Sequence, residues 1–275
     1  MAIPIIESWQ SYFEHMDEGL GSSYERIILN RKLNEIAETY GIKSVLETPC
    51  FGFTGISGIN SISMAQNGMR VTILDHHRHR LEKIKRMWEM TDTEVEALFH
   101  ENYSQLPFED DSFDMSWNFS ALWFVKSLED FLKELDRITK KVIFLCVPNR
   151  SGLGFISQRL LTKQQNKTYC YDNIKPKKII PILKKLAWEQ VESDYIDCPP
   201  WPDIGMSKED FLKKFGLGSV VGEKKDSFSI LDFYSGKDPE FVNKMLAYSW
   251  FEQKAPGLVK LFWAHHRYYL FIKKK

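Results

Sequence analysis

Short apolar stretches alternate with amphipathic stretches over the first 150 residues of the chain. Five of the apolar stretches are predicted strands, at residues 43–47, 70–74, 95–101, 112–118 and 141–147. Apolar residues at helical spacing predict helices before and between them, at residues 24–40, 59–66, 78–90 and 128–139. Strands that alternate with helices in this way indicate βαβ units, and therefore an α/β fold with a parallel sheet.

This rhythm changes after Arg150. A helix is predicted at residues 176–187 and a strand at residues 190–196. The remaining pattern predicts a helix at residues 208–215, a loop at 216–237, a helix at 239–253 and a last strand at 266–272. The residues after Arg150 are therefore predicted to add helices and strands that do not alternate regularly, unlike those of the core.

Composition restricts the classes of function. Lys+Arg and Asp+Glu both number 37, so the formal net charge is zero and no general attraction to nucleic acid is expected. No window approaches the ~20 apolar residues of a membrane span, and the start of the chain lacks a signal-peptide pattern. The cysteines show no CxxC spacing, which argues against a zinc site. We therefore expect a cytoplasmic protein without a membrane span, a nucleic-acid partner or a bound metal.

An acidic residue ends each of the first two predicted strands. Glu47 follows Val45 and Leu46, and Asp75 follows residues 71–74, with a glycine-bearing loop between the two strands. In a doubly wound sheet, both strand ends open onto the crevice where ligands bind. A carboxylate at the second of these positions is the usual acceptor for two ribose hydroxyls, so a nucleoside-containing ligand is predicted.

A specific resemblance follows from residues 105–114, which read QLPFEDDSFD. This segment resembles the LPF-x-D-x-SFD signature of class I S-adenosylmethionine (SAM)-dependent methyltransferases, particularly their small-molecule branch. Residues 132–138 resemble the helix that follows in that family, and residues 45–75 resemble its first two motifs. The resemblance implies a Rossmann-like α/β sheet, mostly parallel with an antiparallel last strand. It also implies SAM as the cofactor and a small molecule as the methyl acceptor.

With this resemblance, the chain divides into three predicted regions. Residues 1–150 are expected to form the SAM-binding core with N-terminal helices, and residues 151–255 a cap that selects the acceptor and carries the sixth strand. Residues 256–275 are expected to contain the final strand that completes the sheet. Aromatic residues make up 14% of the chain and include eight Trp, so we expect an apolar or aromatic acceptor under the cap.

The resemblance also implies positions for the cofactor. Glu47 and Gly52 are expected near the methionine part of SAM, and Asp75 at the ribose, with His76 beside it. Asn102 is expected to face the adenine amino group, with Tyr103 next to it. Asn118, at the end of the fourth strand, is expected to line the floor near the transferred methyl group.

Glu47 helps to separate SAM from a dinucleotide. A dinucleotide places its pyrophosphate over the first loop and the helix that follows, where a carboxylate would repel it. SAM instead carries an ammonium and a sulfonium. The attraction between these cations and a carboxylate is worth roughly a few kcal/mol at an intermediate dielectric. An NAD-dependent oxidoreductase remains an alternative that this argument disfavours.

The first glycine motif departs from the family pattern. Pro49 and Phe51 stand where the family has early glycines, and the loop that reaches Asn60 is longer than usual. A SAM-binding protein that acts as a regulatory or non-catalytic subunit is therefore a second alternative. The sequence does not identify the oligomeric state.

The sequence offers candidates for a catalytic base but does not choose between them. Tyr103, His265 and His266 are the candidate catalytic residues, because methyl transfer to a hydroxyl or amine can need a base. His76, His77 and His79 follow Asp75 closely, but they begin a helix without an acidic or Cys ligand nearby, so no metal is predicted there.

Overall fold

The computed structural model describes residues 9–15, 18–51, 55–161, 169–201 and 229–274. A seven-stranded sheet crosses the molecule in the order β3-β2-β1-β4-β5-β7-β6. The first five strands are parallel, and β7 runs antiparallel to both β5 and β6. The strands are β1 (Ser44–Glu47), β2 (Arg70–Asp75), β3 (Glu96–Phe99), β4 (Phe113–Phe119), β5 (Thr139–Pro148), β6 (Trp188–Ile196) and β7 (His266–Lys273). The predicted Rossmann-like fold, with its mostly parallel sheet and antiparallel last strand, is confirmed.

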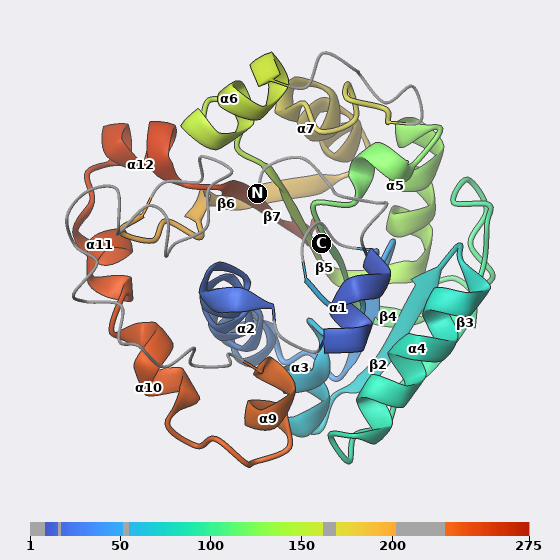
Figure 1. The fold of residues 1–275 in the computed structure, drawn as a ribbon. Helices are drawn as coiled ribbons and strands as arrows, with labels where there is room; N and C mark the ends of the chain where they lie inside the picture. Colours follow the sequence, from blue (N-terminus) through green and yellow to red (C-terminus); the bar gives the residue numbers. More distant parts are fainter. Residues whose placement is uncertain (1–8, 16–17, 52–54, 162–168, 202–228, 275) are drawn as a thin grey trace.

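Helices cover both faces of this sheet (Figure 1). The core helices are α1 (Trp9–His15), α2 (Gly19–Tyr40), α3 (Ile62–Gln66), α4 (Arg78–Glu89), α5 (Leu128–Ile138), α6 (Leu153–Leu161) and α7 (Pro176–Lys185). An arc beside α2 contains α9 (Ile230–Tyr234), α10 (Phe241–Leu246), α11 (Ser249–Lys254) and α12 (Gly257–Trp263). Among the described residues, no helix has the length and apolar character to cross a bilayer.

Successive residues of each strand pack into two separate hydrophobic clusters, one on each face of the sheet. Val45 and Ile73 face the cluster formed with α2, α3 and α4, whereas Leu46 and Leu74 face the cluster formed with α5 and α7. Side chains alternate between the faces of a strand, and a parallel sheet is covered on both faces. This arrangement explains why the predicted strands are continuous apolar runs rather than alternating ones.

Most predicted elements of the core occur within a few residues of their expected ends, but the later region differs. The helix predicted at residues 239–253 is two helices, α10 and α11, interrupted at Ala247 and Tyr248. The loop predicted at residues 216–237 contains the helix α9, whose first turn is capped by Ser229. The helix predicted at residues 208–215 lies outside the described residues.

Candidate functional site

The carboxyl ends of the parallel strands bring the candidate residues to one edge of the sheet. Glu47 pairs with Ile73 and Trp117 in the register of β1 with β2 and β4. Because β7 is antiparallel, its first residue, His266, lies opposite Pro148 at the carboxyl end of β5. This edge is where ligands bind in open α/β sheets.

Glu47 is buried, and its carboxylate faces the start of α3. The Ser61 hydroxyl donates to its Oε2 at 2.6 Å, and the Asn60 amide donates to its Oε1 at 3.3 Å. Burial raises the pKa of Glu47 to about 7, although these hydrogen bonds favour the charged form. Glu47 is therefore a carboxyl group that titrates near neutral pH beside the predicted ligand loop.

A buried ion pair fixes the loop that follows β1. The guanidinium of Arg26, on α2, donates to the Glu18 carboxylate, to Asn60 Oδ1 and to the Ile56 carbonyl. The Ile56 amide donates to Glu18 in turn. Two charged side chains thus attach the loop to α2, and they position Asn60, which donates to Glu47.

Gly58 fixes the other side of the same loop. Its φ is +73°, and a Cβ at this position would lie 2.6 Å from Ile84 Cδ1 on α4. The Trp88 indole, also on α4, donates to the Gly58 carbonyl at 2.7 Å. Only glycine allows this backbone conformation and this close approach without strain.

Asp75 is fully buried and already bound by the chain itself. Arg80 donates to its Oδ2 through Nε at 2.7 Å and to its Oδ1 through Nη2 at 2.5 Å. The backbone N–H of His77 donates to Oδ1 at 2.8 Å, and the Cys50 thiol lies 3.5 Å from Oδ2. The carboxylate is therefore engaged with the start of α4, so a ribose at this position would compete with Arg80.

Aromatic side chains close the space next to this ion pair. The Phe51 ring lies with its centroid 3.7 Å from Arg80 Cζ and 5.0 Å from the centroid of Phe124. His76 Nδ1 lies 2.9 Å from the Tyr103 hydroxyl, and burial lowers the pKa of His76. Burial also raises the pKa of Tyr103, which makes it a poor base at neutral pH.

Asn102 and Gly52 are the remaining cofactor candidates of the sequence. Asn102 is exposed, and its Oδ1 accepts a hydrogen bond from the Ser104 backbone at 3.1 Å. Gly52 lies outside the described residues. The adenine and glycine-loop assignments for these two residues therefore stay predictions.

Buried polar atoms without hydrogen-bond partners collect near the ends of β1 and β4. Among the described residues, neither Asn118 Oδ1 nor Nδ2 has a partner, and the same is true of Thr48 Oγ1 and Ser120 Oγ. Asn118 and Ser120 flank Phe119 at the end of β4, and the Thr48 backbone donates to Trp117, also on β4. Buried polar groups are normally hydrogen-bonded, so these atoms indicate a place for a polar ligand.

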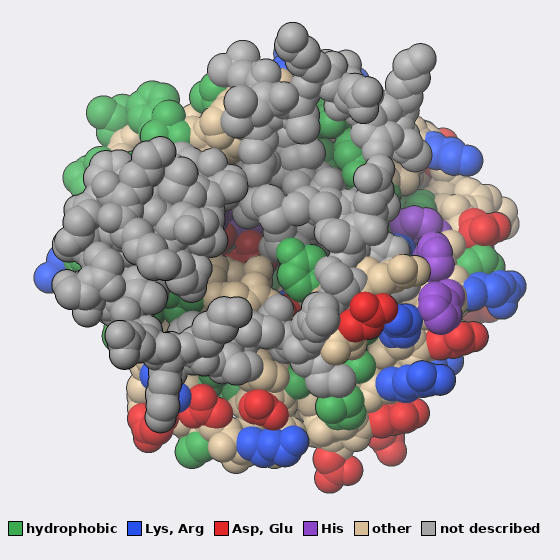
Figure 2. Space-filling model, viewed as in Figure 1, with side chains coloured by type: hydrophobic (Ala, Val, Ile, Leu, Met, Phe, Trp, Pro, Cys, Tyr) green, Lys and Arg blue, Asp and Glu red, His purple; other side chains and the backbone are tan. Residues whose placement is uncertain are grey.

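His265 and His266 lie together with residues that the sequence analysis did not single out. His265 Nδ1 lies 2.7 Å from Asp197 Oδ2, and His266 Nδ1 lies 3.6 Å from the same oxygen. The two histidines hold the pKa of Asp197 well below its usual range despite burial. Figure 2 shows an acidic side chain deep in a hollow near the centre of the viewed face. Asp197 follows the predicted strand at residues 190–196 directly, which is the one signal that could have identified it.

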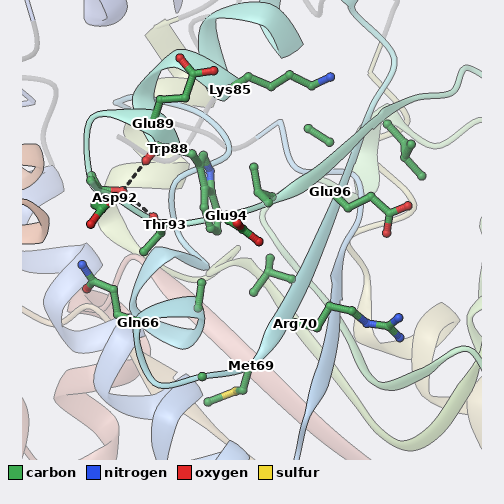
Figure 3. A pocket seen from close by; sticks show the side chains of 17 residues that line it. Gln66, Met69, Arg70, Lys85, Trp88, Glu89, Asp92, Thr93, Glu94 and Glu96 are labelled. Atoms are coloured by element: carbon green, nitrogen blue, oxygen red, sulfur yellow. Dashed lines mark hydrogen bonds between the residues drawn. The ribbon is translucent and has the colours of Figure 1, made fainter.

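A separate cavity lies at the opposite edge of the sheet. It encloses about 1380 Å³ between the end of α4, the turn after α3 and the beginnings of β2 and β3. Figure 3 shows the charged side chains of Lys85, Glu89, Glu94 and Glu96 around it. None of the sequence-predicted site residues lines this cavity, so it is separate from the candidate site.

Comparisons with known proteins agree with the fold. Residues 53–146 match the family described as a methyltransferase domain. No curated protein matches the chain by sequence.

Among solved structures, magnesium protoporphyrin IX methyltransferase from Synechocystis PCC 6803, with bound SAH, has a similar fold. Its TM-score is 0.55 at 10% identity, over 92% of this chain and 84% of that chain. A protein provisionally described as a sarcosine dimethylglycine methyltransferase, from Galdieria sulphuraria, also has a similar fold. Its TM-score is 0.53 at 11% identity, over 89% of this chain and 85% of that chain. These likenesses concern the fold, and the matched domain supplies the family. Residues 53–146 therefore form a methyltransferase domain, within a chain that has the Rossmann-like fold of class I SAM-dependent methyltransferases.

Proposed function

We propose that the chain transfers the methyl group of SAM to a small acceptor bound at the carboxyl ends of β4 and β5 and the amino end of β7. The observation that carries this proposal is the set of unpartnered polar atoms at Asn118, Thr48 and Ser120. They suit a polar ligand such as the methionine part of SAM, whose sulfonium supplies an activated methyl group. The cap region, including residues 151–201 and 229–255, would then select an apolar or aromatic acceptor.

The chain's own contribution in this proposal is orientation and proton removal. Methyl transfer needs the acceptor atom, the methyl carbon and the sulfur in one line, so rigid groups at the ends of β1 and β4 serve as positioning groups. His265, held by Asp197 at 2.7 Å, is the candidate base for an acceptor hydroxyl or amine. Tyr103 is less suited as the base, because its hydroxyl is hydrogen-bonded to His76 and its pKa is raised.

Asn118→Leu is expected to separate a ligand-binding role from a structural one. Removal of two unsatisfied buried polar atoms should raise the free energy of unfolding by about 1–3 kcal/mol without ligand. SAM affinity, measured by calorimetric titration, should fall at the same time.

Asn173→Leu is a matched control, because Asn173 is also buried but donates to the Val125 carbonyl at 2.6 Å. It should lower the free energy of unfolding. If Asn118→Leu binds SAM as the wild type does, Asn118 does not contact the cofactor.

Glu47 is expected to make SAM binding depend on pH. Its pKa of about 7 in the folded chain lies above the ordinary 4.5, so the native state holds this proton more tightly than the unfolded state. Stability from this group is thus present at low pH and lost as pH rises from about 4.5 to about 7. The ammonium and sulfonium of SAM favour the charged carboxylate, so SAM affinity should rise as pH increases through 7.

Glu47→Gln should abolish this pH dependence and leave the weaker, low-pH affinity at all pH values. Attraction over ~4 Å is worth about 1 to 4 kcal/mol between the dielectric of water and that of a protein surface. NADH is the second titrant, because a dinucleotide should bind equally well or better after the change. A variant that keeps the wild-type pH profile would contradict a ligand-facing charge at Glu47.

The second candidate function is a SAM-binding or regulatory protein that does not transfer methyl groups. The observation that favours it is the engagement of Asp75 by Arg80 beside Phe51. Formation of the demethylated product from SAM with a panel of phenols, amines and carboxylic acids tests the difference. SAM binding without turnover on any acceptor would favour this second candidate.

A further inference from the structure

Four titratable side chains meet in the interior beside the candidate site. Glu25 comes from α2, Asp197 follows β6 directly, and His265 precedes His266, the first residue of β7. The side chains of Glu25, Asp197 and His266 are 9%, 2% and 0% exposed, and one ligand atom from each lies within 4.8 Å of the others. We refer to Glu25, Asp197 and His266 as the buried triad.

The fold holds the triad in place through the end of the sheet. His266 pairs with Ile196 on one side and with Pro148 on the other. The His265 backbone donates to the Asp197 carbonyl at 2.9 Å, and Asp197 has a φ of +62°. A non-glycine residue in this region stores strain, which is most common at functional sites.

The triad places two buried carboxylates together beside imidazole groups, which are cationic only when they are protonated. Arg26, the neighbour of Glu25 in sequence, donates to Glu18, Asn60 and the Ile56 carbonyl instead. Among the described residues, Asp197 Oδ1 has no hydrogen-bond partner. Buried charges normally are paired or bind metals, so this arrangement needs a cation or a bound proton.

The distances favour an ion. His266 Nδ1 lies 3.8 Å from Glu25 Oε2 and 3.6 Å from Asp197 Oδ2, which is too long for a hydrogen bond. Two ligand atoms that each lie at about 2.1 Å from one ion, at tetrahedral to octahedral angles, are roughly 3.0–3.5 Å apart. A small inward movement would therefore give the triad the spacing of a metal site.

We propose that the buried triad binds one divalent transition-metal ion. The imidazole ligand suits zinc, iron, manganese or cobalt rather than calcium or magnesium, which prefer oxygen ligands alone. His265 contacts Asp197 at 2.7 Å and orients it, as partners of metal ligands commonly do. No spacing in the sequence indicates this site, because its ligands come from three distant segments.

The position of the triad suggests what the ion does. The His266 ring lies 4.4 Å from the Phe119 ring, between the centroids, and Phe119 separates Asn118 from Ser120 at the end of β4. An ion there would direct its remaining coordination positions toward an acceptor with a hydroxyl or carboxylate oxygen. This role rests on the proposed function, whereas metal binding itself does not.

Titration of the metal-free full chain with Co²⁺ tests the site without SAM or acceptor. Visible absorption reports nitrogen and oxygen ligands, and elemental analysis after dialysis reports stoichiometry. We expect one equivalent in the wild type and none retained in Glu25→Gln or in Asp197→Asn. His265→Gln should weaken the affinity by about 10–100-fold, as expected for the loss of an orienting partner.

A surface control distinguishes adventitious binding. His77 and His79 are exposed near the start of α4, where His side chains gather in Figure 2. The double variant His77→Asn/His79→Gln keeps a capping residue for α4 and should retain the full equivalent. Loss of binding in this variant, or unchanged binding in folded Glu25→Gln, would overturn the proposal.

Folding of the variants is checked on the metal-free proteins. Glu25→Gln removes a buried carboxyl whose pKa is raised well above its usual range by burial and by Asp197. Its thermal midpoint without metal should therefore equal or exceed that of the wild type, and Co²⁺ should raise only the wild-type midpoint. Absence of stoichiometric binding by the folded wild type would also overturn the proposal, and it would leave the methyltransferase assignment untouched.

Discussion

Asp75→Ala is expected to lower the free energy of unfolding by about 3–5 kcal/mol. The substitution leaves the guanidinium of Arg80 buried, with a side-chain exposure of 3%, and removes its bidentate partner. Loss of one member of a buried ion pair costs this much because the remaining charge keeps its desolvation penalty. Since domains are stable by only about 5–15 kcal/mol, a large part of the total is lost. Chemical denaturation followed by circular dichroism measures the difference.

The double variant Asp75→Asn/Arg80→Met is the control for this prediction. It removes both charges together, keeps an acceptor for the His77 amide and fills the space of Arg80 with an apolar chain. Replacement of a buried pair in this way is often neutral or stabilising. If Asp75→Ala unfolds at the same denaturant concentration as the wild type, the carboxylate is open to the crevice, as the sequence analysis expected.

Arg26→Met should have a similarly large effect, of about 3–5 kcal/mol on unfolding. Glu18 would remain buried at 0% side-chain exposure without its guanidinium, and the Ile56 carbonyl and Asn60 would each lose a donor. The loop after β1 would also lose its attachment to α2. We therefore expect weaker SAM binding in the fraction that stays folded, measured by titration at low temperature.

Arg31→Met, on the same helix, is the matched control. Arg31 is exposed, so its loss should change the free energy of unfolding by no more than about 0.5 kcal/mol. Equal effects of the two substitutions would show that the loss of a charge from α2, rather than the contacts of Arg26, determines stability.

The core of the fold follows from local pattern because both faces of its strands are buried. Apolar runs in the sequence predicted the strands β1, β2, β4 and β5. The helix predicted at residues 78–90 corresponds to α4. The helices α6, α9 and α12 were not predicted, and α6 and α12 show a physical reason. In α12, a helix of seven residues, none is buried, so its apolar residues do not mark a face that packs on the core and give a weak helical signal. In α6, Leu153 and Ile156 are exposed at 46% and 42%, which blurs the same signal.

The sequence predicted where the candidate site residues lie along the strands, but not which side chains they contact. The sequence placed Glu47, Asp75 and Asn118 near strand ends, because an acidic or polar residue closes each apolar run. It did not show that Arg80, five residues after Asp75, turns back onto that carboxylate, although a basic residue in the first turn of a helix was visible. Glu25 and Asp197 lie far from His266 in sequence, and only the pairing of β6 with β7 and the packing of α2 unite them.

The place of β7 inside the sheet has a consequence for the synthesis of the protein. β6 pairs only with β7, and β7 separates it from β5. On the ribosome, the first five strands can therefore associate as they emerge, while β6 and the outer edge of β5 wait for residues 266–273. Domains begin to fold from the N-terminal side during translation, so the half-sheet with its exposed edge is the nascent species that chaperones would encounter. His265 and His266 stand at the start of β7, which follows the other six strands in the chain, so the candidate site is completed only after β7 has emerged.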